Sequence, residues 1–354
     1  MVPELRKDPI SRRWVIISTE RAARPTDFKH ESVAPNDIDR CPFCEGRESQ
    51  TPPEIFAFRR PGTEKDTTGW RVRVVSNKFP ALRIEGHTDR ARMGIYTRMD
   101  GVGAHEVIVE TPEHHSHLGL LPVDHVADVI RAYLQRYRDL RNDPRFEYAL
   151  LFRNHGRTAG ASLSHPHSQL IALPVVPNRA AHELDAAVRY FGKQGQCIYC
   201  ALLAQEREAR ERVVWQNEHF IALEPYASRF PFETWILPKA HQADFGALRP
   251  ELEQPMAQAL RETLYRLHTC LNNPPYNFII HTIPYREEAK HAYHWHLEII
   301  PRLTQVAGFE WGSGFYINTV APENAARYLR DVTSDVEGIL PRTEGVRVRG
   351  EGGD

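Results

Sequence analysis

The chain has 354 residues, of which 41% are hydrophobic and 26% are charged, a composition typical of soluble globular proteins. Its 45 Lys and Arg residues are balanced by 46 Asp and Glu residues, which argues against a general nucleic-acid-binding protein. No apolar run approaches the ~20 residues of a membrane-spanning helix, and residues 1–13 lack the apolar core of a signal peptide. We therefore expect a cytoplasmic protein that binds neither membranes nor nucleic acid.

The predicted elements occur twice, in the same order, in the two halves of the chain. The first half has a Cys-x-x-Cys pair, two extended runs, an amphipathic helix and two strands, at residues 41–44, 71–82, 105–114, 123–140, 146–154 and 165–173. The second half repeats them at residues 197–200, 212–223, 233–241, 252–271, 276–281 and 294–300. This order predicts an α+β fold of two duplicated halves, residues 1–175 and 176–340, each an antiparallel sheet with one crossing helix. Residues 341–354 are charged and glycine-rich, so we expect a flexible tail there.

Four of the five cysteines form the two Cys-x-x-Cys pairs, and each pair is followed by two histidines at matching distances. His114 and His165 are 51 residues apart, and His241 and His294 are 53 residues apart. Because zinc favours four cysteine and histidine ligands in a tetrahedron, we predict two structural zinc ions per chain. The predicted ligand sets are Cys41, Cys44, His114 and His165 in the first half, and Cys197, Cys200, His241 and His294 in the second.

Two alternatives stay open for these sets. The cysteine pairs could be redox-active or simply reduced thiols. Other histidines also compete as ligands: His115 and His117 compete with His114, and His281 and His296 compete with His294.

The stretch His165-Pro-His-Ser-Gln169 carries the candidate chemistry. Residues i, i+2 and i+4 of an extended chain share a face, so His165, His167 and Gln169 project together. If His165 binds zinc, it anchors the strand, and His167 is free to attack the α-phosphorus of a nucleotide as a neutral imidazole. Gln169 is expected to donate a hydrogen bond to a phosphoryl oxygen as charge develops on it.

A glycine-rich loop, residues 154–162, lies directly upstream of this stretch and allows backbone N–H groups to approach a phosphate closely. The second half has a matching His294-Trp-His296, but Leu297 and Glu298 follow it, and it lacks such a loop. We therefore place the active copy in the first half and interpret the second copy as structural.

These features resemble the galactose-1-phosphate uridylyltransferase family of the histidine-triad superfamily. The resemblance covers about residues 3–332, and the matching stretches are Glu4–Pro9, Trp14–Ile17, Cys41–Cys44, Ser76–Leu82, Asn154–Gln169 and Gly308–Glu310. It implies two histidine-triad-like halves, the first of them catalytic, in a homodimer. It also implies a ping-pong reaction, in which UDP-glucose uridylylates His167 and releases glucose 1-phosphate, and galactose 1-phosphate then accepts the group.

The resemblance further implies substrate contacts at particular positions. Arg21 and Arg24 are expected to reach phosphates. The nucleotide site is expected to contain Asn77, Asn154, Gly160, Ala161, Ser162 and Gln169. Phe309, Glu310 and Asn318 are expected to reach the sugar across a dimer interface, with ordinary strand roles as the alternative.

One position departs from the family pattern. Some members hold the second metal with a Glu where this chain has Arg179, and their three histidine partners persist as His281, His294 and His296. The second cysteine pair resembles the replacement ligands of a branch that includes phosphorylases acting on ADP-glucose.

Three other functions are weighed against uridylyl transfer. The first is a phosphorylase or adenylyltransferase acting on ADP-glucose. The second, a nucleotide hydrolase, is disfavoured because Gln169 cannot act as an acid. The third, a zinc-supported nucleic-acid-binding module, is disfavoured by the neutral charge.

Overall fold

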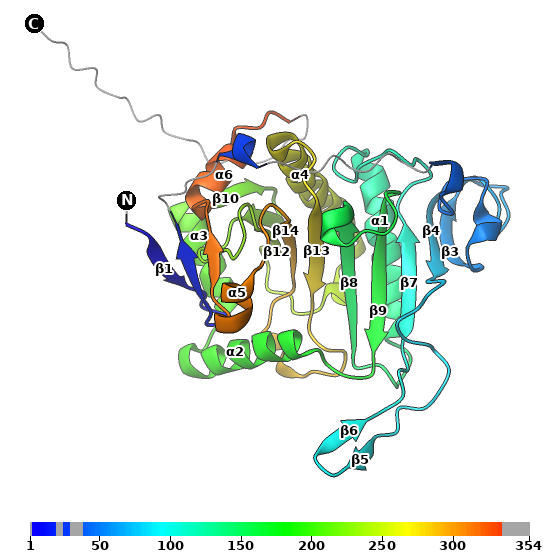
Figure 1. The fold of residues 1–354 in the computed structure, drawn as a ribbon, viewed down its shortest axis with the longest axis horizontal. Helices are drawn as coiled ribbons and strands as arrows, with labels where there is room; N and C mark the ends of the chain where they lie inside the picture. Colours follow the sequence, from blue (N-terminus) through cyan, green and yellow to red (C-terminus); the bar gives the residue numbers. More distant parts are fainter. Residues whose placement is uncertain (1, 19–23, 29–37, 335–354) are drawn as a thin grey trace, which may run out of the picture.

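One ten-stranded antiparallel sheet spans both halves of the chain. The computed structural model describes residues 2–18, 24–28 and 38–334, and the predicted tail at 341–354 lies outside these residues. The strand order is β10-β11-β12-β14-β13-β8-β9-β7-β4-β3. Within this sheet, the strands of the first half occupy the right-hand side of Figure 1, and the strands of the second half lie to their left.

The strands of this sheet and the long helix packed on it follow the same order in both halves, so the predicted α+β class with duplicated halves is confirmed. The first half has β3 (Glu54–Arg59), β4 (Trp70–Ser76), β7 (Ala104–Val109), α1 (Val123–Leu140), β8 (Tyr148–His155) and β9 (His167–Leu173). The second half has β10 (Val213–Gln216), β11 (Phe220–Leu223), β12 (Thr234–Pro238), α4 (Glu253–Leu271), β13 (Tyr276–His281) and β14 (His296–Pro301).

The halves are not two separate sheets, because β8 of the first pairs with β13 of the second. The pairing runs from Tyr276 opposite His155 to Ile280 opposite Leu151. Each half would otherwise expose a strand edge with unpaired N–H and C=O groups, and joining the edges satisfies them.

Helices α1 and α4 lie side by side against the sheet. The apolar face predicted for α1 is buried, since Val126, Ile130, Tyr133, Leu134 and Tyr137 are each at most 1% exposed. Burial of such a stripe stabilises the helix through the hydrophobic effect more than intrinsic helix propensity does.

The predicted single run at 212–223 is in fact a hairpin, β10 and β11. The Oδ1 atom of Asn217 accepts the backbone N–H groups of His219 and Phe220, at 3.0 and 2.7 Å. This side-chain turn offers the backbone an alternative to a continuous strand.

Further elements flank the sheet beside the second half. A three-stranded sheet joins β1 (Glu4–Lys7), β2 (Trp14–Ile17) and β15 (Tyr316–Asn318). The remaining α-helices are α2 (Asn178–Gln194), α3 (Ile198–Ala209), α5 (Gly308–Ser313) and α6 (Pro322–Arg330). Short 3-10 helices occur at Pro25–Asp27, Ile38–Arg40, Glu48–Gln50, Arg157–Ala159, Phe245–Ala247, Pro250–Leu252 and Ala289–His291.

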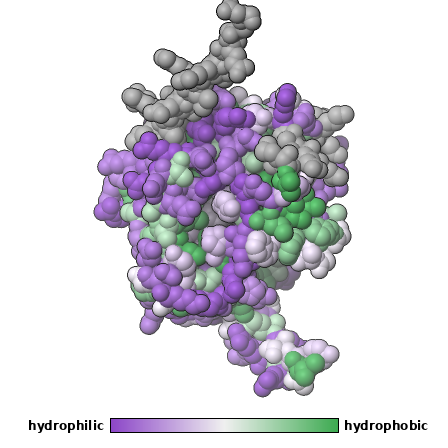
Figure 2. Space-filling view, turned by 90° about the vertical axis from the view of Figure 1, so that its left-hand side faces the viewer, coloured by the Kyte–Doolittle hydropathy of each residue, from purple (hydrophilic) through white to green (hydrophobic). Residues whose placement is uncertain are grey.

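A hairpin of β5 (Ala91–Met93) and β6 (Tyr96–Arg98) projects from the body of the molecule (Figures 1 and 2). Its apolar side chains Met93 and Ile95 are 59% and 90% exposed. Among the described residues, no helix combines the length and apolar character that crossing a membrane requires.

Candidate active site and metal centres

The first predicted ligand set comes together at the start of β9. Ligand atoms of Cys41, Cys44, His114 and His165 all lie within 4.8 Å of one another. Cys44 Sγ is 3.2 Å from His114 Nδ1 and 3.6 Å from His165 Nδ1. The Nε2–H of His165 donates to the carbonyl oxygen of Thr111 at 2.7 Å, which leaves Nδ1 unprotonated toward the thiols. This donor set fits a tetrahedral metal ion.

The second predicted set repeats this arrangement. Its ligand atoms also lie within 4.8 Å of one another, and they belong to Cys197, Cys200, His241 and His294. Cys200 Sγ is 3.3 Å from His241 Nδ1 and 3.7 Å from His294 Nδ1. The Nε2–H of His294 donates to the carbonyl oxygen of Pro238 at 2.9 Å, so its Nδ1 is again the free ligand atom. The chain could therefore hold two metal ions in matching places.

The competing histidines lie outside both sets, and they are His115, His117, His281 and His296. The ring of His117 packs instead against His155 and His268, with ring centres 4.9 and 4.7 Å away. The rings of His281 and His296 stack at 4.6 Å and form a third group of metal-type side chains with Glu183.

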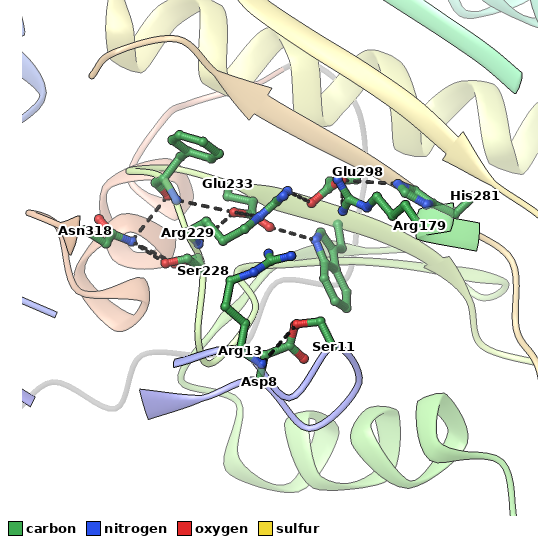
Figure 3. Close-up of polar contacts among 12 residues, drawn as sticks. Asp8, Ser11, Arg13, Arg179, Ser228, Arg229, Glu233, His281, Glu298 and Asn318 are labelled. Atoms are coloured by element: carbon green, nitrogen blue, oxygen red, sulfur yellow. Dashed lines mark hydrogen bonds and ion pairs between the residues drawn. The ribbon is translucent and has the colours of Figure 1, made fainter. Parts of the chain in front are cut away.

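Charge pairs occupy this third group (Figure 3). Arg179 donates to Glu298 at 2.7 Å and to Glu183 at 3.1 Å. The His281 ring lies 3.1 Å from each of the same two carboxylates. Burial opposes charge on the ring, but these carboxylates raise the pKa of His281 overall. The Arg179 guanidinium already occupies both carboxylates and repels a cation, so we assign no metal to this group.

His167 is the first residue of β9 and lines a cavity at the end of that strand. Its Nδ1–H donates to the carbonyl oxygen of His165 at 2.7 Å, since a carbonyl can only accept. The lone pair is therefore on Nε2. The side chain is 6% exposed, and burial lowers its pKa. A neutral imidazole with a free Nε2 is the form that attacks phosphorus.

A buried polar network holds the opposite face of β9. The hydroxyl of Ser168 lies 2.6 Å from the hydroxyl of Tyr133 and also donates to Glu110. Glu110 is fully buried, pairs with Arg153 and accepts from Tyr133 at 3.0 Å. Because α1 supplies Tyr133 and β8 supplies Arg153, this network fixes the position of β9 against both elements.

Gln169 is oriented by His105, a residue that the sequence did not single out as a site residue. His105 Nδ1 accepts the backbone N–H of Ala81 at 3.2 Å, which assigns the ring proton to Nε2. Nε2–H then donates to Gln169 Oε1 at 2.7 Å, so the amide NH2 group of Gln169 is left for a ligand. His105 precedes the cavity residue Val107 by two positions in one strand, and this alternation is the signal that could have found it.

Asn77 presents a second amide group beside Gln169. Asn77 lines the cavity, and its Oδ1 accepts the backbone N–H of Phe79 at 2.8 Å. Its Nδ2 lies 3.1 Å from His105 Nε2. With the His105 proton on Nε2 this is a contact between two donors, so the Asn77 donors are not used there.

The cavity has a volume of about 650 Å³, within the range of small-molecule sites. Four predicted residues line it, namely Asn77, Ser162, His167 and Gln169. Sequence reasoning missed other lining residues, which include Phe43, Thr51, Lys78, Phe79, Val107 and Leu163. Phe43 lies between the two cysteines of the first pair, and its ring centre is 5.3 Å from that of His167. The turn that contains Cys41 and Cys44 therefore also supplies one wall of the cavity.

The glycine-rich loop is shaped by its glycines and by the second half of the chain. Gly156 and Gly160 have φ angles of +79° and +91°, in the left-handed region that favours glycine. Asn277 of β13 donates to Asn154 Oδ1 at 2.8 Å and to the carbonyl oxygen of Ala159 at 2.7 Å. The second half thus supports the loop through two hydrogen bonds from β13.

The other predicted substrate contacts do not line this cavity within one chain, and they are Arg24, Asn154, Gly160, Ala161, Phe309, Glu310 and Asn318. Arg21 lies outside the described residues. Phe309 and Glu310 belong to α5, far from β9 in Figure 1. Asn318 is fully buried and donates to the hydroxyl of Ser228 at 2.9 Å, so its carboxamide is used within the second half.

Sequence profiles of galactose-1-phosphate uridyl transferase match both halves, the N-terminal domain at residues 1–177 and the C-terminal domain at residues 183–335. ADP-glucose phosphorylase of Arabidopsis thaliana is 40% identical over 337 residues, which cover 94% of this chain and 93% of that protein. Galactose-1-phosphate uridylyltransferase of Thermotoga maritima is 30% identical over 342 residues, which cover 94% of this chain and 99% of that protein.

Solved structures agree with these matches. The crystal structure of the Arabidopsis thaliana ADP-glucose phosphorylase with bound ADP-glucose has a TM-score of 0.79 at 37% identity, covering 94% of this chain and 100% of that chain. A uridylyltransferase structure has a TM-score of 0.72 at 29% identity, and the match covers 93% of this chain and 97% of that chain. Profiles, relatives and structures all span both halves. The chain is a nucleotidyltransferase and belongs to the galactose-1-phosphate uridyl transferase family.

Proposed function

We propose that this protein transfers a uridylyl group from UDP-glucose to galactose 1-phosphate through a covalent intermediate on His167. The observation that carries the proposal is a buried, neutral imidazole whose free Nε2 lies at a cavity of about 650 Å³. The uridylyltransferase relatives support this choice of substrates.

The reaction consists of two displacements on one phosphorus. In the first, His167 Nε2 attacks the α-phosphorus of UDP-glucose; a P–N bond forms and the P–O bond to glucose 1-phosphate breaks. In the second, a phosphate oxygen of galactose 1-phosphate attacks the same phosphorus. A P–O bond forms and the P–N bond breaks, which yields UDP-galactose and frees His167.

Two amide groups stabilise the charge that develops on the phosphoryl oxygens. The NH2 groups of Gln169 and Asn77 are both held as donors before substrate binds, because their oxygens accept other hydrogen bonds. The amide of Gln169 is too weak an acid to protonate a leaving group, which favours transfer over hydrolysis.

We further propose that the two Cys-His sets bind structural zinc. Four protein ligands leave no open coordination position, so the ions would hold the strand starts rather than take part in the reaction. Reduced cysteines fit a cytoplasmic protein. We assign catalysis to residues 1–175 and expect a homodimer, in which Arg21, Arg24, Phe309 and Glu310 contribute to binding phosphates and sugar. Phe309 is 48% exposed, which supports contact with a partner subunit.

A second candidate function is phosphorolysis of ADP-glucose. It is favoured by the 40% identity to ADP-glucose phosphorylase, against 30% to the Thermotoga maritima uridylyltransferase. In this reaction His167 would carry an adenylyl group, and inorganic phosphate would accept it to form ADP.

Labelling of the protein tests both candidates. Wild type, His167→Gly and the exposed control His87→Gly are incubated with UDP-glucose or ADP-glucose that carries ³²P in the nucleotide α-phosphate. We expect label from UDP-glucose on wild type and control, discharged by galactose 1-phosphate, and none on His167→Gly. Label from ADP-glucose that inorganic phosphate discharges selects the second candidate. Wild-type labelling of His167→Gly would contradict the nucleophile assignment.

A further inference from the structure

The second half contains a cavity of about 260 Å³ at the place that matches the His167 cavity of the first half. We call it the His296 cavity, because His296 follows a predicted metal ligand by two residues, as His167 does. Trp235 pairs with Glu298 in the sheet as Val107 pairs with Gln169. These matches follow from the duplication of the chain.

The aromatic wall is conserved between the two cavities. Tyr199 lies inside the second Cys-x-x-Cys pair and lines the His296 cavity, as Phe43 lies inside the first pair and lines the His167 cavity. The ring centres of Tyr199 and His296 are 5.1 Å apart. The buried hydroxyl of Tyr199 has no hydrogen-bond partner among the described residues.

The carboxylates around the His296 cavity are already occupied by donors of the protein. Glu298 accepts from Arg179 at 2.7 Å, from His281 at 3.1 Å and from Arg229. Glu233 accepts the backbone N–H of Arg229 at 2.7 Å and the indole N–H of Trp235 at 3.3 Å.

Two further acidic side chains of the wall, Glu183 and Asp8, are likewise engaged. Glu183 accepts from Arg179 at 3.1 Å and from the hydroxyl of Tyr293 at 3.3 Å. Asp8 accepts from the backbone N–H of Ile10 at 2.8 Å and from the hydroxyl of Ser11 within its own turn. The cavity therefore offers a ligand few free acceptors.

The unused hydrogen-bonding groups are donors on three arginines from separate segments. Arg13 points from the turn between β1 and β2 toward Arg229 and Arg179 (Figure 3). Its guanidinium lies 5.3 Å from the ring centre of Tyr316, and no carboxylate pairs with it among residues 2–18, 24–28 and 38–334. The Nη1 groups of Arg179 and Arg229 also have no acceptor within these residues. Burial and the nearby Arg229 lower the pKa of Arg13, as expected for a cation that lacks an anion.

We propose that the His296 cavity is a second binding site, which takes inorganic phosphate or a phosphate monoester and holds it between Arg13, Arg179 and Arg229 without transferring it. Guanidinium groups bind phosphate oxygens through paired, charge-assisted hydrogen bonds. The volume lies just below the ~300 Å³ at which drug-sized sites begin, so a small anion fits better than a nucleotide sugar.

Transfer is not expected at this second site. A carboxylate, Glu298, stands where the first half has the amide of Gln169, and it cannot donate to a phosphoryl oxygen. The ring of His296 is also stacked on His281, with an interplanar angle of 2°. The His296 cavity thus keeps the groups that bind an anion but lacks the amide donor and the free imidazole that transfer requires.

Equilibrium dialysis with ³²P-labelled inorganic phosphate and, separately, with labelled glucose 1-phosphate tests the proposal without using turnover. Wild type is compared with Arg13→Gln, with the charge-preserving Arg13→Lys and with the exposed neighbour Arg12→Gln as matched control. We expect Arg13→Gln to bind one ligand fewer per chain, or at least tenfold more weakly at one site. Arg12→Gln should bind as wild type, and Arg13→Lys should retain most of the binding.

The ligand that binds more tightly, inorganic phosphate or glucose 1-phosphate, identifies the source of the phosphate. Equal stoichiometry and affinity for wild type and Arg13→Gln in both arms would overturn the proposal. Crystals soaked in tungstate, a heavy phosphate analogue, give a second measurement. An anomalous peak among the three guanidinium groups is expected, and peaks confined to the His167 cavity would contradict the second site.

Discussion

His167 and Gln169 share one face of β9, yet each is oriented by a different hydrogen bond. The carbonyl of His165 holds Nδ1 of His167, and His105 holds Oε1 of Gln169. The free lone pair and the free amide N–H groups therefore face one cavity before a substrate binds. Such preorganisation avoids the cost of turning dipoles during the reaction.

At this scale, we predict that His105→Phe lowers kcat by about tenfold to a hundredfold, with a smaller change in KM for the sugar nucleotide. The physical reason is that Gln169 loses the donor that keeps its NH2 group toward the phosphoryl oxygens. Steady-state kinetics measure both constants.

A double-mutant cycle separates this role from a general structural one. In a Gln169→Leu background, His105→Phe should have little further effect on kcat, because the group that it orients is gone. Full additivity of the two losses would show that His105 acts independently of Gln169.

At the scale of elements, each Cys-His set connects a turn or helix to the start of a central strand. In the second half, Cys197 is the N-cap of α3, Cys200 lies in its first turn, and His294 comes just before β14. A metal ion there would fasten α3 to the sheet. A metal ion in the first set would likewise connect the turn that contains Phe43 to the start of β9, and would so position His167.

We predict that Cys200→Ser reduces zinc from about two to about one per chain and lowers Tm by on the order of 10 °C, because structural zinc contributes folding free energy. Metal analysis and thermal unfolding of protein purified without chelator measure the two effects. Cys270→Ser is the matched control, since Cys270 lies outside both ligand sets. Equal zinc content in the two variants would refute the second set.

For the whole molecule, the junction between the halves contains one buried histidine and two partly buried ones as well as paired strands. His117 precedes α1, His155 ends β8 and His268 belongs to α4, so both halves contribute. His155 Nε2–H donates to Asn273 Oδ1 at 2.8 Å. Burial lowers the pKa of His155 to about 3 and holds that of His117 well below its usual value.

These shifts predict that the protein loses stability in mild acid. The folded-state pKa of His155 lies below the unfolded value of about 6.5. As pH falls from 6.5 toward 3, the unfolded chain therefore binds a proton at this histidine that the folded chain does not bind, which favours unfolding. For His155 the free energy of unfolding should decrease by about 2 kcal/mol between pH 7 and pH 5. Urea unfolding across this range measures it.

His155→Gln should remove this part of the pH dependence, because glutamine can still donate to Asn273 but does not titrate in this range. The exposed His87→Gln is the control and should keep the wild-type slope. An identical pH dependence in His155→Gln and wild type would show that the junction does not contribute to acid sensitivity.

Local spacing was enough to predict several features. The helix at 123–140 and the strand at 276–281 have the predicted bounds, because periodicity and flanking turns are encoded within each segment. The two Cys-His sets were predicted from repeated spacing, and the structure brings each set together. The alternation in His165-Pro-His-Ser-Gln169 placed His167 and Gln169 on one face, where both line the cavity.

Other features depend on contacts between residues that are far apart in the chain. The sequence did not indicate that β8 and β13 join two sheets into one, since edge pairing depends on how the halves dock. It did not indicate that His105 orients Gln169, that Asn277 supports the glycine-rich loop, or that Asn318 is buried against Ser228.

The sequence by itself therefore determined the duplicated α+β plan, the candidate ligand sets and the candidate nucleophile, because each depends on short-range order and spacing. Only the tertiary structure decided which tautomer His167 has, which residue orients Gln169, and that Arg13 meets Arg179 and Arg229 beside His296. These outcomes arise from hydrogen bonds and packing across elements, which no single segment of sequence contains.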